Sequence, residues 1–167
     1  YHSLTDLMSV FKTSSIYLEL TKTYRSSEEI IAYTNQILGL NYVRAIRKSN
    51  NKPVLFRKED YNLKELLLND INYLQKEYKS IAVITKDENE AFGIYNLLKN
   101  EINITLLNNN SRKFEKELVI VPSYIAKGLE FDSVIVYNKV NNKYKPNELY
   151  LYYVACTRAQ HELIVYN

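Results

Sequence analysis

The stretch that decides the fold is VPSYIAKGLEFDSVIV, residues 121–136. Two apolar runs, residues 118–121 and 133–137, flank an eleven-residue segment that contains Lys127, Gly128 and Glu130. Short apolar runs bounded by turn residues are typical of strands that are buried on both faces of a parallel sheet. Because the chain has only three glycines, a glycine between a lysine and an acid indicates a tight turn at this position. A simple turn beside solvated charges is the alternative.

The rest of the chain alternates further strand-like runs with helical patterns. Ser26 and Glu29 form a capping-box signature for a helix that ends at Gly39. Asp87, with Glu90, is the expected N-cap of a helix over residues 88–98, and Asn147 is expected to cap a last helix that runs to about Thr157. Helical periodicity also covers residues 63–78, and the remaining predicted strands are residues 16–20, 53–56, 81–84, 104–107 and 163–166.

This alternation predicts an α/β fold, with a mostly parallel sheet that is covered by helices on both faces. Sheets of this kind bind ligands beyond the carboxyl ends of their strands. The length of 167 residues predicts a single domain over residues 1–167, with residues 1–15 as a partly ordered lead-in.

Composition sets few limits on function. The net charge of +3 is too small to imply nucleic-acid binding by itself, although a local groove could still provide it. The single cysteine, Cys156, excludes an internal disulfide framework, and as a lone cysteine on an apolar helix face it is expected in the core. No long apolar run suggests a signal peptide or a membrane span, so we expect a cytoplasmic protein without a membrane partner.

Three candidate catalytic patterns are rejected. Gly39, Gly93 and Gly128 lie too far apart to form a phosphate-binding loop. Asp87 and Glu88 follow an apolar run and could imitate magnesium ligands, but they satisfy the chemistry of a helix cap. Asp60 or Asp70, together with Glu77 and Lys79, could imitate the acids of a metal-dependent nuclease. These residues lie in a segment with helical periodicity, and the solvated surface of a helix explains them. No metal site is predicted.

Three stretches together resemble the C-terminal motifs of superfamily 1 helicases of the UvrD/Rep type. They are YRSSEEIIAYTN (residues 24–35), YIAKGLEFDSVIV (residues 124–136) and LYYVACTRAQHELIVY (residues 151–166), and they occur in the family's order and spacing. The resemblance implies a three-layer RecA-like domain of the P-loop NTPase type, the second motor domain (2A) of a larger chain. It also implies an N-terminal motor domain that carries the phosphate loop and the Mg²⁺ ligands. The stretches VPSYIAKGLEFD and VACTRA are closest to the HelD branch, whose members act on stalled bacterial RNA polymerase.

The resemblance implies an ATP site at the interface with that N-terminal domain. Arg158 resembles the arginine finger that reaches the γ-phosphate, and Arg25 lies between a strand end and a helix N-terminus, where a guanidinium can meet an anion. Tyr24 would stack on adenine and Glu130 would bind the ribose, with Gly128 allowing the turn. The alternatives are an ordinary surface ion pair for Arg25, a helix-dipole role for Arg158 and a core role for Tyr24.

The nucleic-acid site is expected to bind single-stranded nucleic acid, with DNA favoured over RNA, through contacts from Thr85, Lys86, Ser123, Tyr124 and Lys127. The sequence departs from the family pattern in two places. Tyr124 occupies the position of the motif histidine, with Pro122 where a threonine is common, and this puts the contacts with the strand in doubt. Gln160 replaces the arginine that follows TRA, and this weakens one phosphate contact.

The predicted function is therefore the C-terminal core domain of an ATP-dependent helicase or translocase, which is inactive as an isolated chain. The competing hypotheses are a non-catalytic RecA-like binding module and a factor that remodels RNA polymerase without unwinding nucleic acid. A metal nuclease would need acids clustered at strand ends, and the sequence offers no such cluster.

Overall fold

The computed structural model describes residues 9–10, 21–40, 43–58, 62–108 and 117–167. The predicted strand at residues 16–20 and nearly all of the predicted lead-in lie outside the described residues.

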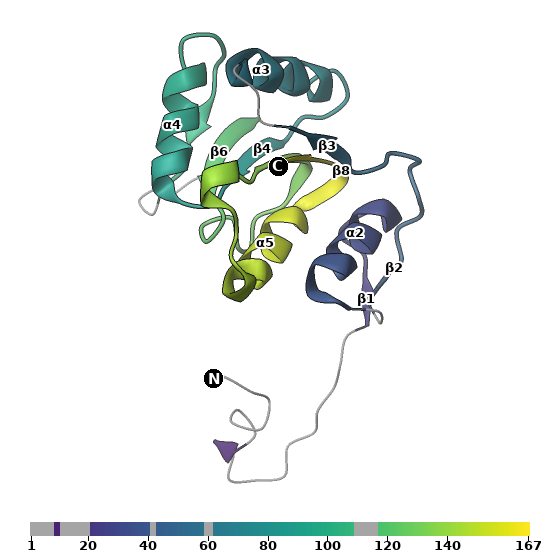
Figure 1. Cartoon of the computed structure of the whole chain (residues 1–167). Coiled ribbons are helices and arrows are strands. Elements are labelled where there is room, and N and C mark those ends of the chain that lie inside the picture. Colours follow the sequence, from purple (N-terminus) through teal and green to yellow (C-terminus); the bar gives the residue numbers. More distant parts are fainter. Residues whose placement is uncertain (1–8, 11–20, 41–42, 59–61, 109–116) are drawn as a thin grey trace.

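A six-stranded sheet forms the centre of the fold (Figure 1). Its order is β3-β8-β7-β4-β6-β5, and every neighbouring pair of strands is parallel, so the predicted α/β class is confirmed. The strands are β3 (Leu55–Arg57), β4 (Ile81–Thr85), β5 (Thr105–Leu106), β6 (Leu118–Pro122), β7 (Phe131–Tyr137) and β8 (Ala159–Tyr166).

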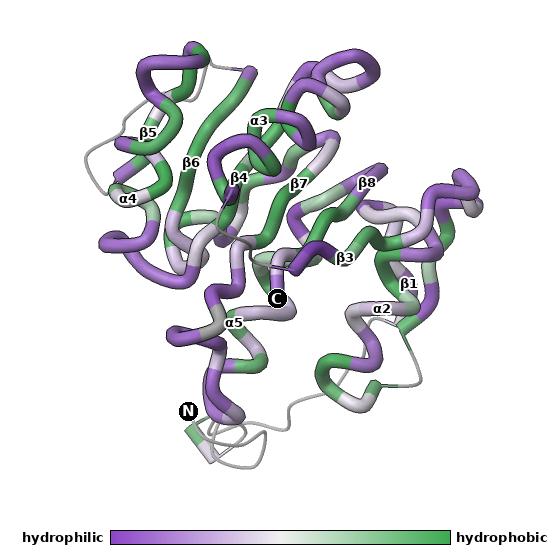
Figure 2. The backbone as a smooth tube through the Cα atoms, turned by 45° about the horizontal axis from the view of Figure 1, so that its top comes forward, coloured by the Kyte–Doolittle hydropathy of each residue, from purple (hydrophilic) through white to green (hydrophobic). Residues whose placement is uncertain are grey.

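The central strands are buried on both faces, as their uninterrupted apolar sequences predict. All five residues of β4 are buried, and alternate side chains point to opposite sides of the sheet. Ala82 and Ile84 belong to one apolar core, whereas Ile81 and Val83 belong to the other. Figure 2 shows the hydrophobic colouring of these strands against the hydrophilic loops that join them.

Four helices within the described residues 21–167 complete a three-layer structure. α2 (Glu28–Leu38) and α5 (Leu149–Cys156) cover one face of the sheet, and α3 (Leu63–Leu74) and α4 (Glu88–Leu98) cover the other (Figure 1). Cys156 is completely buried in the core beneath α5, as predicted. Within the described residues, no helix is long and apolar enough to cross a membrane.

The helix ends agree with the sequence in part. Gly39 ends α2 in the left-handed conformation, with φ at 63°, and Asp87 caps α4 by accepting a 3.0 Å hydrogen bond from the Glu90 amide. The predicted capping box of α2 is wrong, because the helix begins at Glu28, and the hydroxyl of Ser26 instead donates to the Ala159 carbonyl oxygen. Asn147 does not cap α5. It lies in a 3₁₀ turn, η2 (Pro146–Glu148), that leads into the helix; a second turn, η1 (Val140–Asn142), precedes it.

A small two-stranded sheet lies outside the main sheet and flanks α2. It pairs β1 (Lys22–Thr23) with β2 (Arg44–Ala45) in parallel, and Lys22 is the register partner of Arg44. The sequence did not predict these two strands. Each is only two residues long and carries too little apolar pattern to be distinguished from a loop.

Candidate functional site

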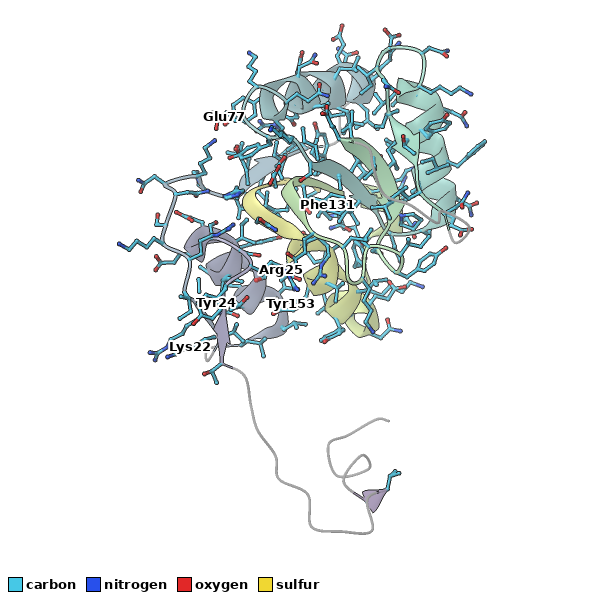
Figure 3. All side chains as sticks on the ribbon, turned by 180° about the vertical axis from the view of Figure 1, so that it is seen from behind. Lys22, Tyr24, Arg25, Glu77, Phe131 and Tyr153 are labelled. Carbon is cyan, nitrogen blue, oxygen red and sulfur yellow. The ribbon has the colours of Figure 1, made fainter. Side chains whose placement is uncertain are left out.

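The fold brings Arg25 and Arg158 to the same groove, which has a volume of about 820 Å³. Arg25 lies in the turn between β1 and α2, whereas Arg158 lies between α5 and β8. Figure 3 shows Arg25 close to Tyr153 of α5, another residue of the groove. Two motifs that are more than 130 residues apart in the sequence therefore contribute cations to one surface.

The site residues lie at an unexpected edge of the sheet. Glu130 and Arg158 immediately precede β7 and β8, so they lie at the amino ends of these parallel strands rather than at the carboxyl ends. The reason is the connections. The segment after β6 crosses back along the sheet without a described helix, and α5 returns the chain from the carboxyl end of β7 to the amino end of β8.

Arg25 forms an ion pair with Glu130. The Nε atom of Arg25 lies 2.5 Å from Oε1 of Glu130, and Gln160 donates from Nε2 to the other carboxylate oxygen at 3.1 Å. The side chains of Arg25 and Glu130 are 38% and 40% exposed, so the pair contributes only about 0–1 kcal/mol to stability. A weak, accessible pair of this kind can open at little cost when a ligand competes for the guanidinium.

Arg158 is held more firmly. It is 7% exposed, and its guanidinium donates to the carbonyl oxygens of Val154 at 3.0 Å and Leu129 at 3.2 Å, and to the Thr157 hydroxyl at 3.2 Å. Burial lowers the pKa of Arg158, and the nearby Arg25 lowers it further. The group nevertheless remains charged, because an arginine does not lose its proton in proteins. The groove therefore has a buried cation at its wall.

Gly128 and Lys127 lie in the segment that follows β6, and both line the groove. Gly128 has φ at 91°, a backbone conformation that side chains with a Cβ rarely adopt. The predicted tight turn at this glycine is therefore present. Lys127 is exposed, and within the part of the chain that the structure describes it forms no ion pair.

Two contacts that sequence reasoning missed attach α2 to the start of β8. The Ser26 hydroxyl donates to the Ala159 carbonyl oxygen at 2.6 Å, and the Ser27 amide donates to the Gln160 carbonyl oxygen at 2.9 Å. Both serines are completely buried. They hold Arg25 beside Glu130. The two serines of the YRSS stretch therefore position Arg25, whereas the sequence pattern assigned Ser26 to a helix cap.

Tyr24 lies next to Arg25 but outside the groove. Its side chain is 73% exposed and borders a smaller polar hollow of about 490 Å³, which also includes Arg25 and Glu130. The other residues of the hollow are Lys22, Thr23, Arg47 and Gln160. Arg25 therefore lines both the hollow and the groove, whereas Tyr24 and Glu130 line the hollow alone.

The residues predicted to contact nucleic acid do not all lie together. Thr85 and Ser123 are buried, and the Ser123 hydroxyl donates to the Lys86 carbonyl oxygen at 2.9 Å, which ties β6 to β4. The Lys86 ammonium lies 2.7 Å from a carboxylate oxygen of Glu148.

Tyr124 and Lys127, in contrast, line the groove with the arginines. The Tyr124 hydroxyl donates to the Glu88 carboxylate at the start of α4. Only two of the five predicted contacts therefore border the candidate site.

The acids considered for metal binding have structural partners. Asp70 accepts a forked interaction from Arg57 and a 2.6 Å hydrogen bond from the Tyr166 hydroxyl, and Glu77 pairs with Lys52. Among the described residues, no group of three or more His, Cys, Asp or Glu side chains could hold a metal ion.

An all-parallel α/β domain with two arginines on one groove, one paired with an acid beside an exposed tyrosine, suits the binding of a phosphorylated ligand. The comparisons with known proteins are more specific. Residues 117–166 match the family model of the UvrD-like helicase C-terminal domain. This range contains Lys127, Gly128, Glu130 and Arg158 but not the stretch with Tyr24 and Arg25.

A solved structure extends the similarity over most of the chain. It is the crystal structure of the C-terminal domain of a possible DNA helicase from Lactobacillus plantarum WCFS1. The two chains are 27% identical, 86% of each is covered, and the TM-score is 0.69. No curated protein matches the chain. The chain is thus similar to the UvrD-like helicase C-terminal domain over residues 117–166, and its fold is similar to that of the C-terminal domain of a possible DNA helicase.

Proposed function

We propose that this chain is the C-terminal motor domain of an ATP-dependent helicase or translocase. It would act with an N-terminal motor domain of the same protein, which supplies the phosphate loop and the Mg²⁺ ligands. The observation that carries the proposal is the meeting of Arg25, Glu130 and Arg158, from three separate sequence stretches, at one edge of the sheet. Cations supplied from a second domain couple phosphoryl transfer to closure of the cleft between domains.

Each residue has a role that fits its position. Arg158 stabilises charge on the transferring phosphoryl group, and this requires its guanidinium to exchange the Val154 and Leu129 carbonyl oxygens for phosphate oxygens. Arg25 binds a phosphate after releasing Glu130, and the released carboxylate accepts a ribose hydroxyl. Tyr24, exposed on the far side of the ion pair, presents its ring to the adenine base.

ATP therefore lies across the Arg25–Glu130 pair in this proposal. The base and ribose lie over the polar hollow, and the phosphates extend toward the groove with Arg158. Because the described residues form no metal site, the chain alone positions the nucleotide but does not complete the catalytic site.

A second candidate function is remodelling of RNA polymerase without unwinding of nucleic acid. It is favoured by the resemblance of the VPSYIAKGLEFD and VACTRA stretches to the HelD branch. The internal contacts of Thr85, Lys86 and Ser123 support it as well. Because the polar groups of these residues have partners within the fold, they are not available to bind a nucleic-acid strand along which the protein moves.

The test of the proposed function uses the longer protein that contains this chain. Its ATPase activity should depend on a single-stranded oligonucleotide and should be lost in Arg158→Ala, whereas Lys99→Ala, an exposed change on the opposite face of the sheet, should leave it unchanged. Unaltered turnover in Arg158→Ala would overturn the assignment. Turnover stimulated by RNA polymerase but not by an oligonucleotide would favour the second candidate.

A further inference from the structure

The start of β8 contains a β-bulge beside the candidate site. Phe131 of β7 is the register partner of Ala159, but Ser133, two residues further along β7, is the partner of Glu162, three residues further along β8. β8 therefore has one extra residue between these two pairs. Bulges of this kind bend a strand, change the direction of its side chains and are common next to functional sites.

The two residues in the bulge, Gln160 and His161, send their side chains to different places. His161 stacks on Tyr78, with the ring centroids 5.9 Å apart, whereas Gln160 lines the polar hollow. The Nε2 atom of Gln160 donates to Oε2 of Glu130 at 3.1 Å. The amide nitrogen must face the carboxylate, because an ionised carboxylate only accepts hydrogen bonds. The bulge thus brings a neutral donor to Glu130.

Each oxygen of the Glu130 carboxylate has its own donor. The Nε atom of Arg25 lies 2.5 Å from Oε1, and Gln160 occupies Oε2. When Arg25 turns to a phosphate, the bond from Gln160 remains, so Oε1 becomes free while the carboxylate keeps its place. The Glu130 side chain is 40% exposed, and without this bond it would regain rotamers that point into solvent. Because the amide carries no charge, it holds the carboxylate without replacing Arg25 as the ionic partner.

The main chain of Gln160 supports the other half of the ion pair. Its carbonyl oxygen accepts a 2.9 Å hydrogen bond from the amide of Ser27, which is the N-cap of α2 and follows Arg25 by two residues. Gln160 also follows Arg158 by two residues. One residue is therefore joined to the turn that carries Arg25, to the Glu130 carboxylate and to the strand that begins after Arg158.

We propose that Gln160 is a positioning residue that holds Glu130 for a ribose hydroxyl of the nucleotide, and that it thereby makes the site select ribonucleotides over deoxyribonucleotides. The inference rests on the proposed function, in which Arg25 releases Glu130 and the carboxylate accepts that hydroxyl. Gln160 does not contact the reacting phosphate in this arrangement. Its loss should therefore weaken the binding of ATP without slowing the chemical step.

The experiment measures the steady-state ATPase activity of the longer protein with ATP, 2′-deoxy-ATP and 3′-deoxy-ATP. The test variant Gln160→Met keeps an unbranched side chain of similar length and removes the donor. The control variant Gln75→Met makes the same change at an exposed glutamine at the end of α3, on the opposite face of the sheet. Unfolding curves establish that both variants are folded.

The wild-type protein should lose about tenfold in kcat/KM with the analogue that lacks the hydroxyl bound by Glu130, because the lost hydrogen bond is to a charged group. In Gln160→Met the KM for ATP should rise about tenfold with little change in kcat, whereas the KM for that analogue should stay at its wild-type value. Gln75→Met should keep the wild-type values for all three nucleotides.

A double-mutant cycle joins the effect to Glu130. Glu130→Ala should lose the same selectivity for ribose, and Glu130→Ala/Gln160→Met should be no less selective than Glu130→Ala, because both changes remove one contact. Independent, additive losses would mean that Gln160 does not act through Glu130 and would overturn the inference.

A readout without nucleotide tests the contact itself. In this chain the NMR resonances of the Gln160 side-chain amide should shift in Glu130→Ala and stay unchanged in Glu148→Ala, which removes a different carboxylate from the wall of the groove. Resonances that do not move in Glu130→Ala would refute the bond between the two side chains.

Equal losses with ATP and with both deoxynucleotides in Gln160→Met would indicate a structural role alone and would overturn the inference, as would a wild-type protein that does not select ribose. Failure of the proposed function is a different result, because it appears as turnover that does not depend on Arg158. Turnover that depends on Arg158, with wild-type selectivity in Gln160→Met, would remove only the role given to Gln160.

Discussion

Replacement of Arg158 by alanine should destabilise this chain before any catalytic effect is considered. The guanidinium makes three internal hydrogen bonds, two of them to backbone carbonyl oxygens, and it is almost completely buried. Hydrogen bonds of this kind contribute about 0.5–1.5 kcal/mol each, and the cost of burying the charge, which also lowers the pKa of Arg158, offsets part of the sum. We therefore expect Arg158→Ala to lose about 1–3 kcal/mol of unfolding free energy.

Urea denaturation followed by circular dichroism measures this loss. Arg25→Ala is the matched control, because it removes an arginine from the same groove but breaks an ion pair that is about 40% exposed, for which we expect about 0–1 kcal/mol. Arg158→Lys should fall between wild type and alanine, since lysine keeps the charge without the planar fork. Equal stability of Arg158→Ala and wild type would refute the view that the guanidinium is held by these carbonyl oxygens.

The same substitution separates structure from catalysis in the longer protein. Under conditions where the variant is fully folded, Arg158→Ala should lower kcat about a thousandfold and weaken nucleotide binding much less, because the phosphate contact strengthens in the transition state. Arg158→Lys should recover stability better than turnover. If kcat recovered in parallel with stability, Arg158 would be a structural residue and not an arginine finger.

Three further outcomes are expected. The chain by itself should not hydrolyse ATP, since its described residues hold no metal site, and a phosphate-release assay that found turnover sensitive to Arg158→Ala would contradict this. In the longer protein, Tyr24→Ala should raise the KM for ATP more than it lowers kcat while Tyr24→Phe is nearly neutral, so equal defects in steady-state kinetics would exclude stacking. Burial opposes ionisation of Asp132, but hydrogen bonds from Ser80 and Lys79 lower the pKa of its carboxyl group. The ionised carboxylate should therefore stabilise the fold above about pH 4, and this stabilisation should be lost as the pH falls through the lower folded pKa. Unfolding curves of Asp132→Asn should show a weaker dependence on acid than those of the wild type, and an unchanged pH profile would contradict this.

The elements that the sequence predicted well are those with a strong local signal. Residues 88–98 form a helix with the predicted bounds, because its Asp87 cap and its apolar period are both encoded within a few residues. Residues 81–84 and 118–121 form buried strands, since their apolar runs have no polar face to place toward solvent. The α2 cap failed because Ser26 had a partner, Ala159, that is 133 residues away in the sequence.

The candidate site followed the same division. The residue types and the order of the three motifs were readable from the sequence, and so was the tight turn at Gly128. Their arrangement was not: the Arg25–Glu130 pair joins residues 105 positions apart, and Gln160 completes it from a third segment. Lys86, which looked available for nucleic acid, is bound to Glu148 on η2.

The sequence by itself determined the class of fold and the chemistry available, because apolar period, capping residues and glycine positions act through neighbouring residues along the chain. Only the tertiary structure decided where that chemistry lies. The strand order put β8 beside β7, which set Arg158 and Glu130 together at the amino ends of the strands, and the Ser26 and Ser27 hydrogen bonds carried Arg25 to the same edge. It also made Lys22 and Arg44 register partners, since pairing between two short strands depends on the packing of α2 and not on any pattern within them.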